Sequence, residues 1–232
     1  MKKIMWIISL VCLAGTAMIM QFLPESIPMH YDFEGNIDRW GSRYESIVFP
    51  LVILAFSLFW TILIGYYEKK ALKTSDEKES AGAKSNAKVL AITGISMAAI
   101  FTVMQAFSLY GAYTAAVSNA TRQVVDIGRV SIFLIGIIMV VLGNFMTKTR
   151  INSAVGFRIS WSMYNENTWR KSNRFAAFAI MTAGVLTIIT AALVNTSMAA
   201  TFAMLGYLLA ATIVSLIYAH KVYTDEISAE KS

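Results

Sequence analysis

The sequence predicts an all-α membrane protein with six transmembrane helices, both termini in the cytoplasm and a short folded loop outside. Three observations point to this class. The residues are 56% hydrophobic and only 15% charged, the mean hydropathy is +0.57, and long uncharged runs recur along the chain. A soluble domain carries about 25% charged residues and cannot hide so much apolar surface in its core. The single cysteine excludes an internal disulfide and a cysteine-rich metal site.

A helix that crosses a bilayer needs about 20 mostly apolar residues. The stretches that meet this requirement are 4–23, 46–67, 89–113, 127–147, 175–194 and 198–219. The first is expected to be a retained span, because its apolar run is longer than a signal-peptide core. The uncharged stretch 175–220 is too long for one helix. Because Asn195-Thr196-Ser197 offers a break, we expect two spans joined by a tight turn there.

The distribution of basic residues predicts the orientation. With the N-terminus in the cytoplasm, most of the 20 Lys and Arg residues lie on the cytoplasmic side. The exceptions are Arg39, Arg43, Arg122 and Arg129. Lys and Arg flank the apolar runs and form no groove-sized patch, so the net charge of +6 does not indicate nucleic-acid binding.

These spans divide the chain into four parts. They are 1–67, with two spans around the outer loop 24–45; 68–88, a flexible cytoplasmic linker; 89–222, with four spans and the basic inner loop 148–174; and 223–232, a cytoplasmic tail. The linker mixes charges with Ser, Gly and Ala and cannot bury apolar surface, so we assign it no site.

The predicted spans hold almost no charge, since only Arg129 enters one, at its outer edge. Ion-coupled transporters commonly need a carboxylate at mid-depth, and intramembrane metalloproteases need paired His and Glu. The spans offer neither, so an enzyme is not expected and no cofactor is predicted. The alternative function that stays open is a membrane enzyme, possibly metal-dependent, or a transporter of a membrane-borne substrate.

In the outer loop, apolar and polar residues alternate from Ile27 to Glu34. This predicts a short extended segment with one apolar face, followed by a turn. The candidate ligand-binding residues are His30, Asp32, Glu34, Asp38, Arg39 and Trp40. Three interpretations stay open: a folded plug, a recognition surface for a cationic or amphipathic ligand, or a divalent-metal site. His30 and Asp32 are the candidate metal ligands, because nitrogen and oxygen donors suit zinc or harder cations.

The inner loop combines Trp, Asn, Gly and basic residues. Asn165 followed by an acid is typical of a helix start. On such a helix Trp169 and Asn173 share one face, as do Arg170 and Arg174. The Trp residues can be interfacial anchors, and the basic residues can hold anionic lipid head groups or form an output surface.

Two stretches resemble one known family. The inner motif is similar to the signature of the SdpI family of bacterial membrane proteins, and residues 23–43 resemble an amino-terminal domain often found with it. The motif residues are Asn144, Asn152, Gly156, Arg158, Trp161, Asn165, Trp169, Lys171, Asn173 and Arg174. This chain has Ser160 where the family usually has Pro, and Asn173 where it usually has His. Asn cannot titrate or serve as a typical metal ligand, so a mechanism that needs that His is not expected here.

The resemblance implies immunity and signalling in the bacterial plasma membrane. Family members confine a toxic secreted peptide at the membrane, and act as receptors that hold a repressor there. The implied partners are a secreted toxin or signalling peptide, a cytoplasmic transcriptional repressor and the lipid bilayer, with no direct contact to nucleic acid.

Overall fold

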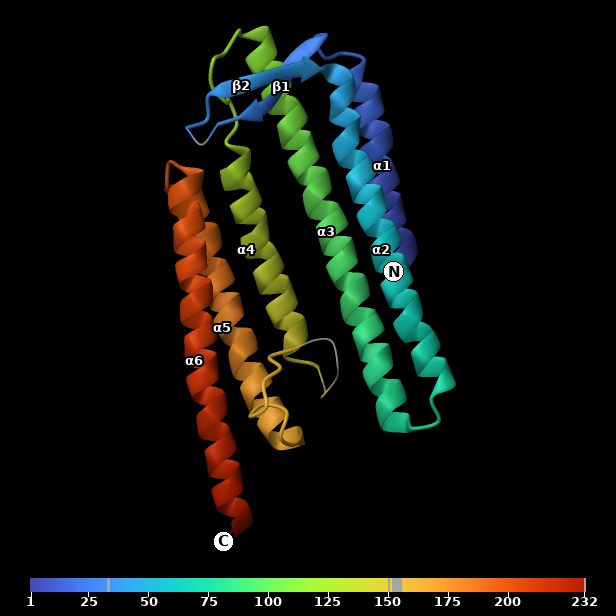
Figure 1. Cartoon of the computed structure of the whole chain (residues 1–232), viewed down its shortest axis with the longest axis vertical. Helices are drawn as coiled ribbons and strands as arrows, with labels where there is room; N and C mark the ends of the chain where they lie inside the picture. Colours follow the sequence, from blue (N-terminus) through green and yellow to red (C-terminus); the bar gives the residue numbers. More distant parts are fainter. Residues whose placement is uncertain (33, 150, 152–155, 232) are drawn as a thin grey trace. The chain divides into compact units, whose positions relative to one another are not determined.

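The computed structural model describes the chain except residues 33, 150, 152–155 and 232, and describes only the backbone of residue 231. Within this part of the chain, six helices are long and apolar enough to cross a membrane, which confirms the expected class. Their bounds are α1 Lys2–Met20, α2 Val48–Lys73, α3 Glu77–Val117, α4 Ile127–Met146, α5 Glu166–Leu193 and α6 Ser197–Lys231 (Figure 1). Large apolar side chains such as Ile62, Phe202 and Ile217 stand exposed, as expected of helices that face lipid. The orientation of the termini stays a prediction.

The chain divides into two compact units, which are described separately. The outer-loop unit comprises residues 1–62 and 91–130, and the inner-loop unit comprises residues 63–90 and 131–232. Helices α2, α3 and α4 each contribute residues to both units.

Small residues let α1, α2 and α3 pack closely in the outer-loop unit. The Ser9 and Ser57 hydroxyls lie 2.7 Å apart and satisfy each other inside the helix packing. A Cβ atom at Gly94 would lie 2.8 Å from the sulfur of Met5, so a larger residue there would require the Met5 side chain to move. Hydrogen-bonded small polar side chains and close backbones are the usual means of association for helices in lipid.

A β-hairpin connects α1 to α2. Strand β1, Ser26–Tyr31, pairs antiparallel with β2, Ile37–Ser42, and a 3-10 helix, Arg43–Ile47, leads into α2. The expected alternation holds only in part in β1: Ile27 is buried against Leu109 and Ala112 of α3 and His30 is exposed, but Pro28 is buried as well. Figure 1 shows the hairpin crossing near the end of α3, beside the ends of α1 and α2 to which it is connected.

The α5–α6 pair organises the inner-loop unit. Helix α5 ends at Leu193 and α6 begins at Ser197, which confirms the expected tight turn. The Phe175 and Tyr218 rings stack 4.1 Å apart across the pair. Helix α4 packs on α5 through glycine, because a Cβ at Gly136 would lie 2.9 Å from the carbonyl oxygen of Gly184.

The segments expected to be a flexible linker and a tail are mostly helical. Residues 68–73 continue α2, residues 77–88 open α3, and only a short connection, 74–76, separates them. Asp76 caps α3, because its Oδ1 accepts hydrogen bonds from the backbone nitrogens of Lys78 and Glu79 at 2.8 and 3.3 Å. The tail likewise continues α6 as far as Lys231.

Candidate functional site

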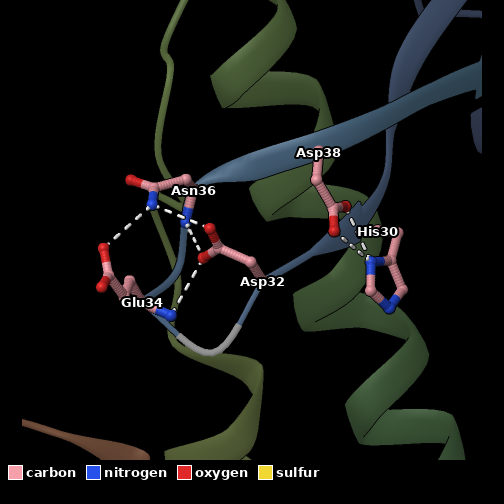
Figure 2. A network of polar contacts seen from close by, with 5 residues as sticks. All are labelled: His30, Asp32, Glu34, Asn36 and Asp38. Atoms are coloured by element: carbon pink, nitrogen blue, oxygen red, sulfur yellow. Dashed lines mark hydrogen bonds and ion pairs between the residues drawn. The ribbon is translucent and has the colours of Figure 1, made fainter.

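Asp32 organises the turn of the outer hairpin. Its Oδ1 accepts hydrogen bonds from the backbone nitrogens of Glu34 and Asn36 at 2.9 and 2.8 Å, and its Oδ2 accepts one from Asn36 Nδ2 at 2.9 Å (Figure 2). These hydrogen bonds hold the pKa of Asp32 below its usual value, and the bond from the Asn36 side chain contributes most. Gly35 completes the turn with a φ of +81°, a conformation that glycine adopts without strain. Asp32 therefore acts inside the turn and is not free to bind a ligand with both oxygens.

His30 and Asp38 form a separate pair on the exposed side of the hairpin. The Nδ1 atom of His30 lies 2.7 Å from one carboxylate oxygen of Asp38, and the two side chains are 65% and 43% exposed. Figure 2 shows this pair apart from the Asp32 network. Among the described residues, no group of three or more His, Cys, Asp and Glu side chains converges as a metal site would require. The structure therefore does not bring the candidate metal ligands His30 and Asp32 to one point.

The three remaining outer candidates, Glu34, Arg39 and Trp40, are all exposed, and Arg39 forms an ion pair. Arg39 donates to Glu45 Oε2 at 3.0 Å, and Glu45 Oε1 accepts from the backbone nitrogen of Ser42 at 3.0 Å. Trp40 is 44% exposed on β2. Glu34 is exposed at the turn, where Asn36 Nδ2 also approaches its carboxylate at 3.4 Å.

The connection between α3 and α4 holds the hairpin turn in place. The backbone nitrogen of Ile37 donates to the oxygen of Thr121 at 2.9 Å, and that of Gln123 donates to the oxygen of Gly35 at 2.8 Å. The Arg122 guanidinium donates a further hydrogen bond of 2.7 Å to the main-chain oxygen of Glu34. Residues 121–123, which lie far from the hairpin in the sequence, therefore stabilise its turn through hydrogen bonds.

A cavity of about 360 Å³ lies beneath the hairpin, between β1, α2 and α3. Its lining is mostly apolar, and Ile27, Phe49, Met104 and Leu109 contribute to it. The polar members are Tyr31, Glu45, Ser46, Gln105 and Ser108. This cavity was not predicted, because it depends on residues of the hairpin and α3 that lie far apart in the sequence.

Gln105 is a buried polar residue that lines this cavity. Its Nε2 donates to the backbone oxygen of Ser46 at 3.0 Å and to Thr16 Oγ1 at 3.3 Å. These bonds use the amide nitrogen and leave the carbonyl oxygen as the group that can accept a hydrogen bond from a ligand.

Asn173 and Trp169 form the buried centre of the inner motif. Asn173 is 2% exposed, and its Nδ2 donates to the oxygen of Met146 at 2.6 Å and to Thr149 Oγ1 at 2.7 Å. Its Oδ1 accepts from the backbone nitrogen of Phe157 at 2.9 Å. One amide therefore joins the end of α4, the following turn and the inner loop to α5.

Gly156 makes this close packing possible. Its φ is +123°, and a Cβ there would lie 2.6 Å from the Trp169 ring and 2.8 Å from Asn173 Oδ1. The structure thus brings together Gly156, Trp169 and Asn173 of the motif. Asn152, another motif residue, lies outside the described residues.

Asn165 is the N-cap of α5, as its position before an acid predicts. Its Oδ1 accepts from the backbone nitrogens of Asn167 and Thr168 at 3.0 and 2.8 Å. Its Nδ2 donates to Glu226 of α6 at 2.9 Å, and Asn167 donates to the other oxygen of Glu226. Sequence reasoning missed Glu226, although its spacing from Val222 and Glu230 places the three on one face of an extended α6.

The other motif residues lie at the surface of the inner-loop unit. Trp161 is half-buried, and its ring meets the edge of His220 at 4.6 Å. The exposed members are Asn144, Arg158, Lys171 and Arg174, together with the neighbouring Arg170 and Ser160. The Arg174 guanidinium lies 5.9 Å from the Phe178 ring centroid. The motif therefore has a buried structural core and an exposed basic surface.

The comparisons with known proteins match these two regions. Residues 148–219, from the turn after α4 into α6, match the SdpI/YfhL protein family. The inner-motif region is similar to the SdpI family. Residues 7–54, which hold most of α1, the hairpin and the start of α2, match a domain of unknown function, DUF1648. The SdpI resemblance of the inner motif and the paired amino-terminal domain are thereby confirmed.

One curated relative extends the similarity over most of the chain. The chain is 22% identical over 188 residues to the Immunity protein SdpI of Bacillus subtilis (strain 168), and the alignment covers 80% of each protein. No solved structure shows a significant match. Together with six membrane-length helices, the SdpI similarity identifies a multi-pass membrane protein of bacterial type.

Proposed function

We propose that the protein is a non-enzymatic membrane immunity protein that binds a toxic or signalling peptide at its outer-loop unit. The similarity to an immunity protein of the SdpI family supports this role. The structural observation that carries the proposal is the cavity beneath the hairpin. Its volume of about 360 Å³ lies within the range of ligand sites in proteins, about 300–1,000 Å³.

The chemistry of the cavity and its rim fits an amphipathic, cationic peptide. An apolar side chain of the peptide enters between Phe49, Met104 and Leu109. The side-chain carbonyl oxygen of Gln105 accepts a hydrogen bond from a backbone N–H group of the peptide. Above the cavity, residues 24–45 hold more Asp and Glu than Arg, so the exposed side attracts positive charge. Exposed Glu34, Asp38 and Trp40 supply that contact surface.

A signal reaches the cytoplasm only if the peptide binds one helix arrangement more tightly than another. In this proposal both termini and the inner loop face the cytoplasm, as the positive-inside count predicts. The exposed basic side chains Arg158, Arg170, Lys171 and Arg174 then form the output surface, to which a cytoplasmic repressor binds. Reporter fusions within residues 24–45 and 148–174 test this, and fusions that place both on one side of the membrane contradict it.

Blocking the cavity tests the peptide site. Ser108 is exposed on α3 at the cavity wall, so Ser108→Trp narrows the cavity without filling a packed position. Ala106→Trp is the matched control, because Ala106 is exposed on the same helix and does not line the cavity. The variants are produced in a sensitive bacterium that lacks its own SdpI-type protein, which is then challenged with candidate secreted peptides.

We expect the wild type and Ala106→Trp to protect the cells, and Ser108→Trp to lose protection while accumulating in the membrane at the same level. Equal protection by both Trp variants contradicts the cavity as the peptide site. Unchanged killing by every candidate peptide, even in cells with the wild type, contradicts the immunity function itself.

A further inference from the structure

A second cavity lies in the inner-loop unit, where α2 and α3 meet at their charged ends. Its volume is about 210 Å³, and its lining includes Tyr67, Lys70, Lys78, Glu79, Gly82 and Asn86. It is separate from the outer peptide site and from the buried motif around Asn173. Most of its lining comes from the segment 68–88, which was expected to be a linker without a site, and Tyr67 and Ile151 complete it.

Asn86 is a buried amide whose oxygen has no partner among the described residues. The side chain lines the cavity and is 3% exposed, and its Oδ1 has no hydrogen-bond partner among the described residues. A buried polar atom that lacks a partner has lost its hydrogen bonds to water without replacement, so such atoms are rare in folded proteins. Because the two ends of an amide can exchange by a flip, Asn86 can present either an acceptor or a donor to a ligand.

The charges around the cavity favour an anion. Glu79 is neutralised, since it accepts from Lys70 at 2.9 Å and from the Thr74 hydroxyl at 2.8 Å. Lys78 also lines the cavity and is exposed, and no described carboxylate pairs with its amine. The lining therefore has one positive charge beyond the internal pair.

The cavity lies where α2 changes from apolar to charged. The helix is uncharged from Val48 to Tyr67, and Glu68, Lys69 and Lys70 follow directly. Tyr66 and Tyr67 pack edge to face at this boundary, with ring centroids 5.2 Å apart. Tyrosines at the end of an apolar span mark the level of lipid head groups.

We propose that this cavity binds the phosphate and hydroxyl groups of an anionic phospholipid head group of the phosphatidylglycerol type. The phosphate oxygens accept charge-assisted hydrogen bonds from the amine of Lys78, with Lys70 beside it. A glycerol hydroxyl bonds to the Asn86 amide and satisfies its unused atom. The acyl chains lie along the exposed apolar surface of α2, where they stay in the bilayer.

Calorimetric titration of the full-length protein in a nonionic detergent tests this site. The probes are short-chain phosphatidylglycerol, short-chain phosphatidylcholine and glycerol 1-phosphate. We expect the phosphatidylglycerol to bind, and Lys78→Gln to weaken that binding about tenfold, as loss of a hydrogen bond to a charged group does. The matched control is Lys84→Gln, because Lys84 is exposed on the same helix but does not line the cavity.

Two further variants separate binding from folding. Asn86→Leu is expected to weaken binding yet keep or raise the thermal stability, because it removes a buried amide oxygen that has no partner among the described residues. Gly82→Leu fills the cavity, since a side chain at Gly82 meets no atom within 4 Å. Gly65→Leu is its control, as that glycine is equally open on α2 and lies outside the cavity.

The probes also distinguish the source of the head group. Binding of phosphatidylglycerol with no binding of glycerol 1-phosphate supports a lipid held in the bilayer. Equal binding of both supports a soluble ligand that carries the same phosphate and hydroxyl groups. Equal affinity for phosphatidylcholine overturns the proposal. Losses as large in Lys84→Gln and Gly65→Leu as in the cavity variants overturn it as well.

Discussion

The indole nitrogen of Trp169 donates a hydrogen bond to the main-chain oxygen of Thr149 across 2.9 Å. Trp169 belongs to the first turn of α5 and Thr149 to the turn that follows α4, so this bond joins two helices that are separate in the sequence. The ring is 1% exposed. A tryptophan that anchors a helix at the membrane surface would keep its ring at the interface. Trp169 is instead part of the packed centre of the inner-loop unit.

We predict that Asn173→Leu destabilises the protein by about 3 kcal/mol or more, because several buried polar groups lose their partner at once. Asn173→His is expected to cost less, since a ring with one donor and one acceptor replaces part of the network. The measurement is thermal unfolding in detergent. Lys171→Gln, an exposed change two residues away, is the control. Equal midpoints for Asn173→Leu and this control would show that the three bonds contribute nothing.

Gly156→Ala is predicted to destabilise the inner loop by about 1–3 kcal/mol, because φ at this position is +123° and the new methyl group meets Trp169. The same change at Gly65 is expected to be neutral or to gain up to about 1 kcal/mol, because that position is helical and open. Thermal unfolding of both variants measures the difference. A Gly156→Ala protein as stable as Gly65→Ala contradicts the steric argument.

The outer turn is predicted to loosen in acid. The hydrogen bonds to Asp32 lower its pKa below the ordinary value of 3.8, so ionised Asp32 stabilises the turn. This stabilisation is complete above pH 3.8 and is lost as the pH falls through the lowered pKa. Amide exchange in residues 34–37, corrected for its intrinsic pH dependence, should rise in that range. Asp32→Asn should abolish the acid step, and a step that persists in this variant assigns it to another group.

Glu226→Gln is predicted to release the end of α6 from the N-cap of α5. The carboxylate accepts from both Asn165 and Asn167, and the amide keeps only one acceptor oxygen. We expect tryptic cleavage after exposed Lys221 to accelerate about fivefold, as loss of a partly exposed hydrogen bond to a charged group allows. Asp225→Asn removes the same charge from an exposed neighbour and should leave the cleavage rate unchanged.

Arg158→Ala is predicted to abolish function while leaving membrane insertion intact. Arg158 is exposed and lies in the inner loop, outside every helix. Arg158→Lys, which keeps the charge, should retain part of the activity if the surface binds an acidic partner. The measurements are protection in the killing assay and the amount of protein in the membrane. If the alanine variant fails to accumulate, Arg158 is structural and does not belong to the output surface.

The sequence predicted those features whose causes are local or periodic. The uncharged runs predict the spans, because lipid accepts only hydrogen-bonded backbone with apolar side chains. Asn165 before Glu166 predicts the start of α5 because an N-cap side chain accepts hydrogen bonds from the first turn of its own helix, which is a local effect. Asp76 carries an equivalent signal in front of Glu77, but the mixed charges of residues 68–88 led us to expect an irregular linker.

The features that escaped prediction depend on contacts over long distances in the sequence. Asn173 was expected on the face of a helix, but its partners Met146 and Phe157 come from two other segments. The outer cavity needs the hairpin and α3 together. Asp32 was a candidate ligand-binding residue together with His30, whereas its carboxylate accepts hydrogen bonds from Asn36. Such local side-chain bonds compete with regular backbone pairing, and the alternation of residues does not reveal them.

Both end residues of α4 belong to features described above. Its first residue, Ile127, lines the outer cavity, while the main-chain oxygen of its last residue, Met146, accepts a hydrogen bond from Asn173. Its 20 residues form a rod about 30 Å long. A helix of this length matches the hydrocarbon thickness of a bilayer, so the backbone groups of α4 find their partners within the helix and need none from lipid.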